Sequence, residues 1–271
     1  TRLHAGRFLL GGRVLQAACA QLAFIGASTP FPMASSGFFL QPTRSMLPSE
    51  HAKQMAAGME CVLGNTRSQF FEDFYLLPFL LKAAGGGPGT FVELGALDGV
   101  QYSNTFMLEH CFGWSGLLIE ANPHNYQKLL RAPRPRSSKV HSAACNASGF
   151  VNLTVGGNAV SAQVDVQAAA HKAHWKVGGR TAEVPCKPLG ELMRDAGLQG
   201  GTFLSLDVEG AELRVLETVR PELFQVVLVE ADNANPQKDA AVHNLLTKGA
   251  GLWFNRYQRL GPNRIYLHRD L

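Results

Sequence analysis

The stretch FVELGALDGV, residues 91–100, decides the fold, because it joins an apolar run to a turn with two glycines and an acid. A buried strand needs no carboxylate, and a surface loop needs no apolar lead-in. The combination predicts a short strand at 90–94 that ends by presenting backbone and charge to a ligand. Gly95 and Gly99 are expected to let the backbone approach that ligand closely.

Strand and helix patterns alternate on both sides of this stretch, which indicates parallel βαβ units. Strands are expected at 115–119, 139–143, 150–155, 201–208, 223–232, 251–257 and 264–269. Helices are expected at 68–84, 101–112, 123–132, 186–198, 209–219 and 235–249. The fold class is therefore α/β: a doubly wound, Rossmann-like sheet that is mostly parallel. The final strand pair is joined by a short turn at 261–263, so it must be antiparallel.

The chain divides into an α/β domain at 61–271 and an irregular N-terminal extension at 1–60. Residues 1–49 carry four arginines and no acid, as targeting segments do. The apolar stretch 14–27 is too short to span a bilayer comfortably. We expect the extension to contact a protein partner or a membrane surface; the alternative is an incidental tail. The expected compartment is an organelle, plastid or mitochondrion, with membrane association, and the alternative is a secretory-pathway membrane.

Charge and cysteine usage narrow the function classes. The whole chain has a net charge of +4, and from residue 50 onward 21 basic and 21 acidic residues cancel. This balance favours no nucleic-acid partner. Five cysteines without a CxxC pair predict free thiols in a reducing compartment. Two sequons, at Asn146 and Asn152, matter only in the secretory pathway.

Acidic or polar residues follow nearly every expected strand, where ligands bind in such sheets. Glu120 lies 25 positions after Gly95, where an acid accepts hydrogen bonds from a ribose diol. The first loop is not the phosphate-binding GxGxxG, and Asp98 would repel a pyrophosphate. An acid-lined nucleoside pocket suits S-adenosylmethionine, with its sulfonium and ammonium, better than a nicotinamide dinucleotide.

The segments FVELGALDG, LLIEANPHNYQKL, HSAACNASG and FLSLDVEGAELRVLE, in that order, resemble the FkbM-type family of S-adenosylmethionine-dependent O-methyltransferases. The longer form from Phe91 to Ala121 is also similar to the eukaryotic branch that includes protein Star, some of whose members are membrane-tethered. The resemblance implies S-adenosylmethionine as cofactor. The cofactor-binding residues that it implies are Glu93, Gly95, Ala96, Asp98, Gly99, Glu120, Asn122, Ala143 and Ala144.

Methyl transfer needs an aligned oxygen and a group that removes its proton. Asp207 and Glu209 are the expected catalytic residues, each a candidate general base. A divalent metal held by Asp207, Glu230, Asp232 and Asn233 is a less favoured alternative, and so is a helix-capping role, with Glu209 and Glu212 the best candidates.

Several other residues receive ordinary roles. His171, His174 and Trp175 are expected in a mobile, solvated loop at 156–182. Trp114 and Trp253 are expected to pack in the core. PRPRSSK, residues 133–139, is expected to be a solvated basic connector.

Two functions follow. The first is an O-methyltransferase acting on a hydroxyl of a small molecule, glycan or lipid. The alternative is a catalytically silent, methyltransferase-like subunit that serves the assembly of a larger, membrane-bound organellar complex.

Overall fold

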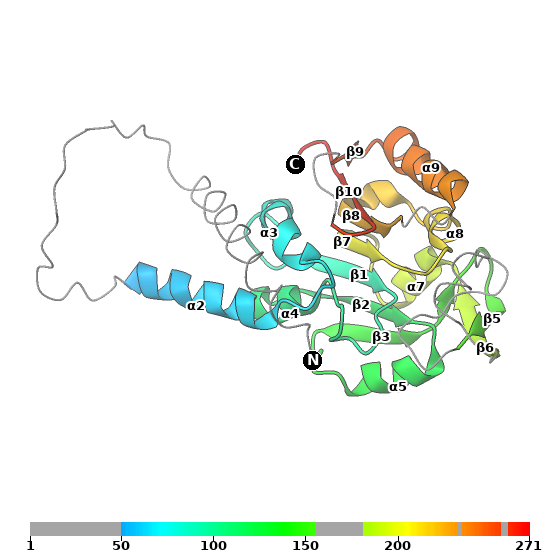
Figure 1. The fold of residues 1–271 in the computed structure, drawn as a ribbon, viewed down its shortest axis with the longest axis horizontal. Helices are drawn as coiled ribbons and strands as arrows, with labels where there is room; N and C mark the ends of the chain where they lie inside the picture. The colour runs from blue at the N-terminus through cyan, green and yellow to red at the C-terminus, as the bar shows by residue number, and fades with distance from the viewer. Residues whose placement is uncertain (1–49, 156–180, 232–234, 256–259) are drawn as a thin grey trace, which may run out of the picture. The chain divides into compact units, whose positions relative to one another are not determined.

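The computed structural model describes residues 50–155, 181–231, 235–255 and 260–271 (Figure 1). Residues 61–271 form one compact unit. The residues before it form a second unit, of which the structure describes only the beginning of α2. In the described part of the chain, no helix has both the length and the apolar character needed to cross a bilayer.

The helices and strands alternate over most of the chain. The helices are α2 (Glu50–Asn65), α3 (Glu72–Ala83), α4 (Phe106–Phe112), α5 (Pro123–Arg131), α7 (Leu189–Asp195), α8 (Glu212–Leu216) and α9 (Pro236–Asn244), with a short 3₁₀ helix, η2 (Pro221–Leu223), and a short π-helix, η3 (Leu245–Gly249). The strands are β1 (Thr90–Leu94), β2 (Ser115–Glu120), β3 (Ser137–His141), β4 (Ala143–Ala144), β5 (Gly149–Thr154), β6 (Thr181–Lys187), β7 (Gly201–Leu206), β8 (Phe224–Glu230), β9 (Trp253–Phe254) and β10 (Asn263–Leu267).

The main sheet has seven strands in the order β3-β2-β1-β7-β8-β10-β9. The first five are parallel, while β10 runs antiparallel to both β8 and β9. The predicted mostly parallel sheet with an antiparallel final pair is confirmed. The chain order reverses between β1 and β7, so the topological switch point, where ligands bind in open α/β sheets, lies at their carboxyl ends.

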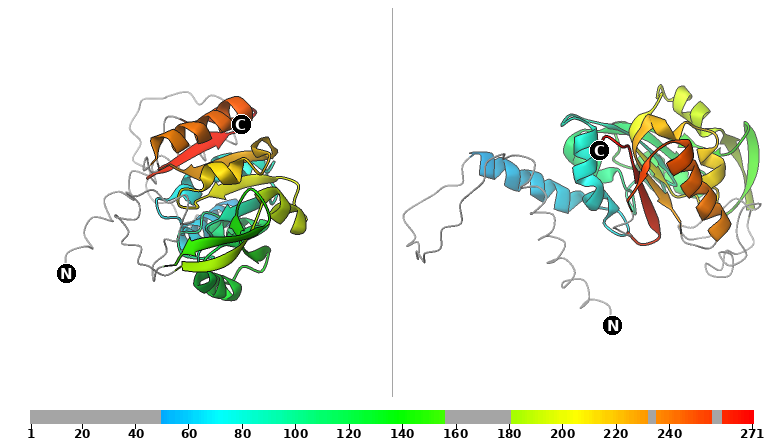
Figure 2. Two further views of the ribbon diagram at one scale, coloured as in Figure 1. Left: turned by 90° about the vertical axis from the view of Figure 1, so that its right-hand side faces the viewer. Right: turned by 90° about the horizontal axis from the view of Figure 1, so that it is seen from above.

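Side chains of β1 alternate between two cores because both faces of the sheet are covered. Val92 and Leu94 pack with residues of α7, α8 and α9. Phe91 packs on the opposite face with residues of α3 and α4. Figure 1 and Figure 2 show helices on both faces of the main sheet. This two-sided burial explains why β1, β7 and β8 are almost continuously apolar.

A second, three-stranded sheet has the order β4-β6-β5. Strand β6 pairs antiparallel with β5 and parallel with β4. The predicted helix at 186–198 is wrong at its start, because Cys186 and Lys187 belong to β6 and α7 begins at Leu189. Likewise, Ala143 leaves the predicted strand 139–143 and joins this second sheet together with Ala144.

Four of the five cysteines form disulfides, Cys61–Cys111 and Cys145–Cys186. The prediction of free thiols is wrong for these four, and Cys19 lies outside the described residues. The partners are 50 and 41 positions apart. No local spacing signals such pairs, because the fold alone brings them together.

Three further expectations are corrected or fall outside the described residues. Trp114 is buried as predicted, but Trp253 is 48% exposed, so its core role is wrong. The predicted helix at 101–112 begins only at Phe106. The loop residues His171, His174 and Trp175 lie outside the described residues.

Candidate functional site

Glu120 ends β2 and lies beside the switch point. Its Oε2 accepts a hydrogen bond from the Leu97 backbone N–H at 2.8 Å, and its Oε1 accepts one from the Asn122 N–H at 2.7 Å. The side chain is buried. Desolvation raises the pKa of the Glu120 carboxyl to about 7, the charge of Asp207 adds to the rise, and the backbone hydrogen bonds oppose it. A carboxylate has about four lone-pair sites, so the group retains capacity to accept from a further donor.

Asn122 begins α5 as its N-cap. Its Oδ1 accepts hydrogen bonds from the N–H groups of His124 and Asn125, and Pro123 occupies the first helical position. The structure thus gives the Asn122 side chain a definite role in the protein, whereas a place beside adenosine stays a prediction. Ala143 and Ala144 are both buried: Ala144 packs in the main core and Ala143 in the core of the small sheet.

Gly95 and Gly99 are required by protein packing. Gly95 has φ +77°, and a Cβ there would lie 2.1 Å from the Asp207 carbonyl oxygen. Gly99 has φ +78°, and its Cβ would lie 2.6 Å from the Leu129 side chain. The backbone at both glycines therefore comes close to a neighbour, as the sequence predicts. In the described residues, however, these neighbours are Asp207 and Leu129 of the protein and not a ligand. Between the glycines, Ala96 is buried.

Asp98 closes the turn after β1. Its Oδ1 accepts hydrogen bonds from the N–H groups of Val100 at 2.9 Å and Gln101 at 2.7 Å. Contact of this carboxylate with the methionine end of a cofactor stays a prediction.

Glu93 is held inside the protein. Its carboxylate accepts hydrogen bonds from Ser103 Oγ at 2.8 Å, Thr105 Oγ1 at 2.5 Å and the Asn104 N–H at 2.7 Å. These bonds hold residues 103–105 against β1, which explains why α4 begins only at Phe106. Glu93 thereby shapes the loop beside the switch point.

Arg134 completes this network, and the expectation of a solvated connector at 133–139 is wrong at this residue. Its side chain is buried, with Nε donating to Glu109 Oε2 at 2.6 Å. The guanidinium also donates to the Gly99 carbonyl, Ser103 Oγ and Thr105 Oγ1. The neighbouring Arg131 and Arg136 are exposed, so no feature of the basic run distinguishes the buried arginine.

Asn104 is a site candidate that the sequence analysis missed. Its Nδ2 donates to Ser205 Oγ at 2.9 Å. Ser205 pairs with Glu93 across β7 and β1, one residue before both strands end. The Asn104 Oδ1 is buried and has no hydrogen-bond partner among the residues that the structure describes. A buried acceptor of this kind at the switch point fits the ammonium group of a ligand.

Three acids gather at the ends of β7 and β8. Asp207, Glu209 and Glu230 each place a carboxylate oxygen within 4.8 Å of the others. Desolvation raises the pKa of Glu230, and the charges of Asp207 and Glu209 raise it further. Desolvation and the Glu212 charge also raise the pKa of Asp207, although solvent reaches this exposed residue and limits the shift. Of the alternative metal ligands, Asp232 and Asn233 lie outside the described residues.

Glu212 is the first residue of α8 and holds the turn before the helix, whereas α8 itself has no side-chain cap hydrogen bond at its N-cap, Ala211. The Glu212 Oε1 accepts hydrogen bonds from the N–H groups of Val208 and Gly210, which precede α8. Its Oε2 accepts one from Lys238 Nζ at 2.5 Å. Glu209, in contrast, has φ +54° and lies before the helix, with its carboxylate among the three gathered acids.

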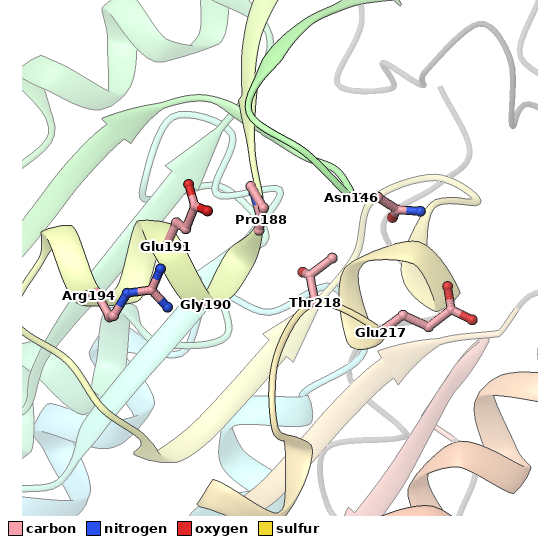
Figure 3. A pocket seen from close by; sticks show the side chains of 7 residues that line it. All are labelled: Asn146, Pro188, Gly190, Glu191, Arg194, Glu217 and Thr218. Atoms are coloured by element: carbon pink, nitrogen blue, oxygen red, sulfur yellow. The ribbon is translucent and has the colours of Figure 1, made fainter.

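A surface hollow of about 450 Å³ lies apart from these strand ends. Figure 3 shows it between the beginning of α7 and the residues after α8, with Glu191, Arg194 and Thr218 among its lining. It contains none of the predicted cofactor-binding or catalytic residues.

The residues at the switch point fit S-adenosylmethionine by their donor and acceptor chemistry. Glu120 offers acceptors for the two ribose hydroxyls, and Asn104 offers its unpaired Oδ1 for the ammonium group. The ionised carboxylates of this cluster would favour a nearby sulfonium electrostatically.

Comparison with solved structures finds similar chains at low sequence identity. Solved structures similar to this chain include the methyltransferase FkbM of Methylobacillus flagellatus KT, with 12% identity, a TM-score of 0.43, and coverage of 81% of this chain and 60% of that one. Another is the O-methyltransferase of Bacillus cereus in complex with SAH, with 12% identity, a TM-score of 0.40, and coverage of 82% and 93%. This chain thus spans about 60% of the length of the FkbM structure. No curated protein matches the chain.

The family model for the methyltransferase FkbM domain matches residues 93–251. The matched region contains all nine predicted cofactor-binding residues and both predicted catalytic residues. On this evidence the chain belongs to the FkbM methyltransferase family.

Proposed function

We propose that the chain is an S-adenosylmethionine-dependent O-methyltransferase, with the cofactor bound across the ends of β1 and β2. The single observation that carries the proposal is the placement of Glu120. It ends the strand next to the switch point, and two backbone N–H groups orient its carboxylate. Family membership supports the same reaction class.

Bound at this site, S-adenosylmethionine supplies an electrophilic methyl group. The role of the chain would be to hold and orient the cofactor: Glu120 would accept hydrogen bonds from the ribose hydroxyls, and Asn104 Oδ1 would accept one from the ammonium group. Glu93 and Arg134 hold the surrounding loop in place, as their hydrogen bonds to residues 99–105 indicate.

Asp207 is the proposed general base for the acceptor hydroxyl. Its raised pKa brings the carboxylate closer to the pKa at which proton removal is efficient near neutral pH. Desolvation and the charge of Asp207 raise the pKa of Glu230 still more strongly, which favours its protonated form, the form that would donate a hydrogen bond to Asp207. Glu209, within 4.8 Å of both, is the alternative base. The acceptor class, a small molecule, glycan or lipid hydroxyl, stays a prediction, as does placement in the branch that includes protein Star.

The proposal is tested first by isothermal titration of the full chain with S-adenosylmethionine. We expect binding that is lost in Glu120→Ala and strongly weakened in Glu120→Gln, which keeps the shape of the side chain. Glu222→Gln is the matched control, because Glu222 is an exposed acid paired with Arg220, and its binding should be unchanged. Absence of binding to a folded chain would favour the alternative, a silent assembly subunit.

Asp207→Asn separates binding from chemistry. If Asp207 is the base, the variant keeps cofactor affinity and loses about 10²–10⁴-fold in methyl transfer once an acceptor is identified. Full activity with normal binding would exclude Asp207 as the base.

A further inference from the structure

The two disulfides bear on the compartment in which the chain folds. Cys61–Cys111 and Cys145–Cys186 join segments that are distant in the sequence. Such bonds form and persist in oxidising environments, the lumen of the secretory pathway among them. Asparagine-linked glycans are added in that same compartment, at Asn-X-Ser/Thr. The disulfides therefore indicate the compartment in which sequons such as those at Asn146 and Asn152 are glycosylated.

The sequon at Asn152 lies on the edge strand of the small sheet. Strand β5 pairs only with β6 in the described sheet order β4-β6-β5 (Figure 1). Leu153 is 2% exposed and packs in the core of the small sheet, so its neighbour Asn152 points to the opposite face, where it is exposed. Thr154, the hydroxyl residue of the sequon, shares that face because side chains alternate along a strand.

Phe150 shares this face as well. It is 70% exposed, more than any other large apolar side chain in the described part of the chain. An exposed aromatic ring two residues from Asn152 lies within reach of a sugar attached to that asparagine. The negative face of an aromatic ring attracts polarised C–H groups, which one face of a pyranose ring presents.

We propose that Asn152 carries an N-linked glycan and that the Phe150 ring packs against its first sugar. The proposal goes beyond methyl transfer and does not rest on it. In the attachment step, Asn152 Nδ2 bonds to the anomeric carbon of a lipid-pyrophosphate-linked oligosaccharide. The bond from that carbon to the pyrophosphate oxygen breaks, the lipid pyrophosphate leaves, and Nδ2 gives up one proton to the transferase.

Asn146 has no equivalent neighbour. It is exposed, but the residue two positions before it is the buried Ala144. Ser148, the hydroxyl residue of its sequon, donates to Glu191 at 2.7 Å. The proposal therefore concerns Asn152 alone.

The first test uses the protein isolated from the cells that make it. A peptide N-glycosidase in ¹⁸O-labelled water releases the glycan and converts a glycosylated asparagine to labelled aspartate, which mass spectrometry of the Asn152 peptide detects. We expect labelled aspartate at position 152. An unmodified Asn152 throughout the isolated protein would overturn the proposal.

The second test measures the Phe150 contact with a double-mutant cycle in the full chain, made in eukaryotic cells that add the glycan. Phe150→Ala is expected to lower Tm by about 2–4 °C when the glycan is present. In the Asn152→Gln background, which carries no glycan at this site, the same substitution should leave Tm unchanged. Equal shifts in the two backgrounds would show that the ring does not contact the sugar. Any glycan on Asn146 is common to all four proteins and cancels.

Discussion

Replacing Arg134 by Met should destabilise the protein strongly, because the guanidinium is the buried cation of a charged network. Arg134 donates to Glu109 Oε2 at 2.6 Å, to Gly99 O at 2.9 Å, to Ser103 Oγ at 3.1 Å and to Thr105 Oγ1 at 2.7 Å. Methionine has a similar length but no charge, so the buried Glu109 would lose its only salt-bridge partner among the described residues and keep the hydrogen bonds from Ser137 and the Arg136 N–H. Breaking a buried ion pair from one side costs about 3–5 kcal/mol, which for a domain of this size lowers Tm by roughly 6–20 °C.

Urea unfolding followed by circular dichroism measures the effect. Arg136→Met is the matched control, because Arg136 is exposed and contacts Glu109 through its backbone N–H; its change should stay within about 0.5 kcal/mol. Adding Glu109→Gln to Arg134→Met should recover part of the loss, since the unpaired charge is then removed.

The pH dependence of the stability that Arg134→Met loses gives a second readout. Desolvation raises the pKa of the Glu109 carboxyl, but hydrogen bonds from Ser137 and Arg134 outweigh it, so the pKa is lowered. In the wild type, the stability that comes from the lowered pKa of Glu109 is present above the pKa of this group in the unfolded chain. It is lost as pH falls through the pKa of Glu109 in the folded protein. In Arg134→Met the folded pKa rises, so acidification protonates the unpaired carboxyl and the gap from the wild type narrows. A cost of Arg134→Met below about 1 kcal/mol, typical of a surface pair, would refute the reasoning.

Two further predictions concern the switch point. Because burial raises the pKa of Glu120 to about 7 and ribose hydroxyls favour its ionised form, affinity for S-adenosylmethionine should fall below pH 7. Titration at pH 6 and pH 8 checks this, with Glu120→Gln expected to bind equally weakly at both. Gly95→Ala should cost more stability than Gly197→Ala, although the two glycines have similar φ values of +77° and +76°. The reason is that a Cβ at Gly95 would lie 2.1 Å from the Asp207 carbonyl oxygen, whereas a Cβ at Gly197 would have no atom within 4 Å. Thermal unfolding compares the variants, and equal costs would mean that backbone strain alone matters.

Local patterns in the sequence determined the main sheet and the residues at its strand ends. The apolar runs of β1, β7 and β8 predict buried strands, because strands covered on both faces need apolar side chains at successive positions. The polar residues at the carboxyl ends of β2 and β7, Glu120 and Asp207, were predictable because parallel strands bring their carboxyl ends to one edge.

Only the tertiary structure decided which polar groups meet across long separations. In the sequence, nothing distinguishes Arg134 from the exposed Arg131 and Arg136. In the folded protein, α4 and the loop after β1 surround Arg134 and bury it. The cysteine pairs, strand β6 and the unpaired Asn104 Oδ1 likewise depend on partners that are distant in the sequence. Hydrophobic periodicity reports which face of an element is buried, but it carries no information about which buried charge, thiol or amide lies opposite. That choice follows from how the elements pack.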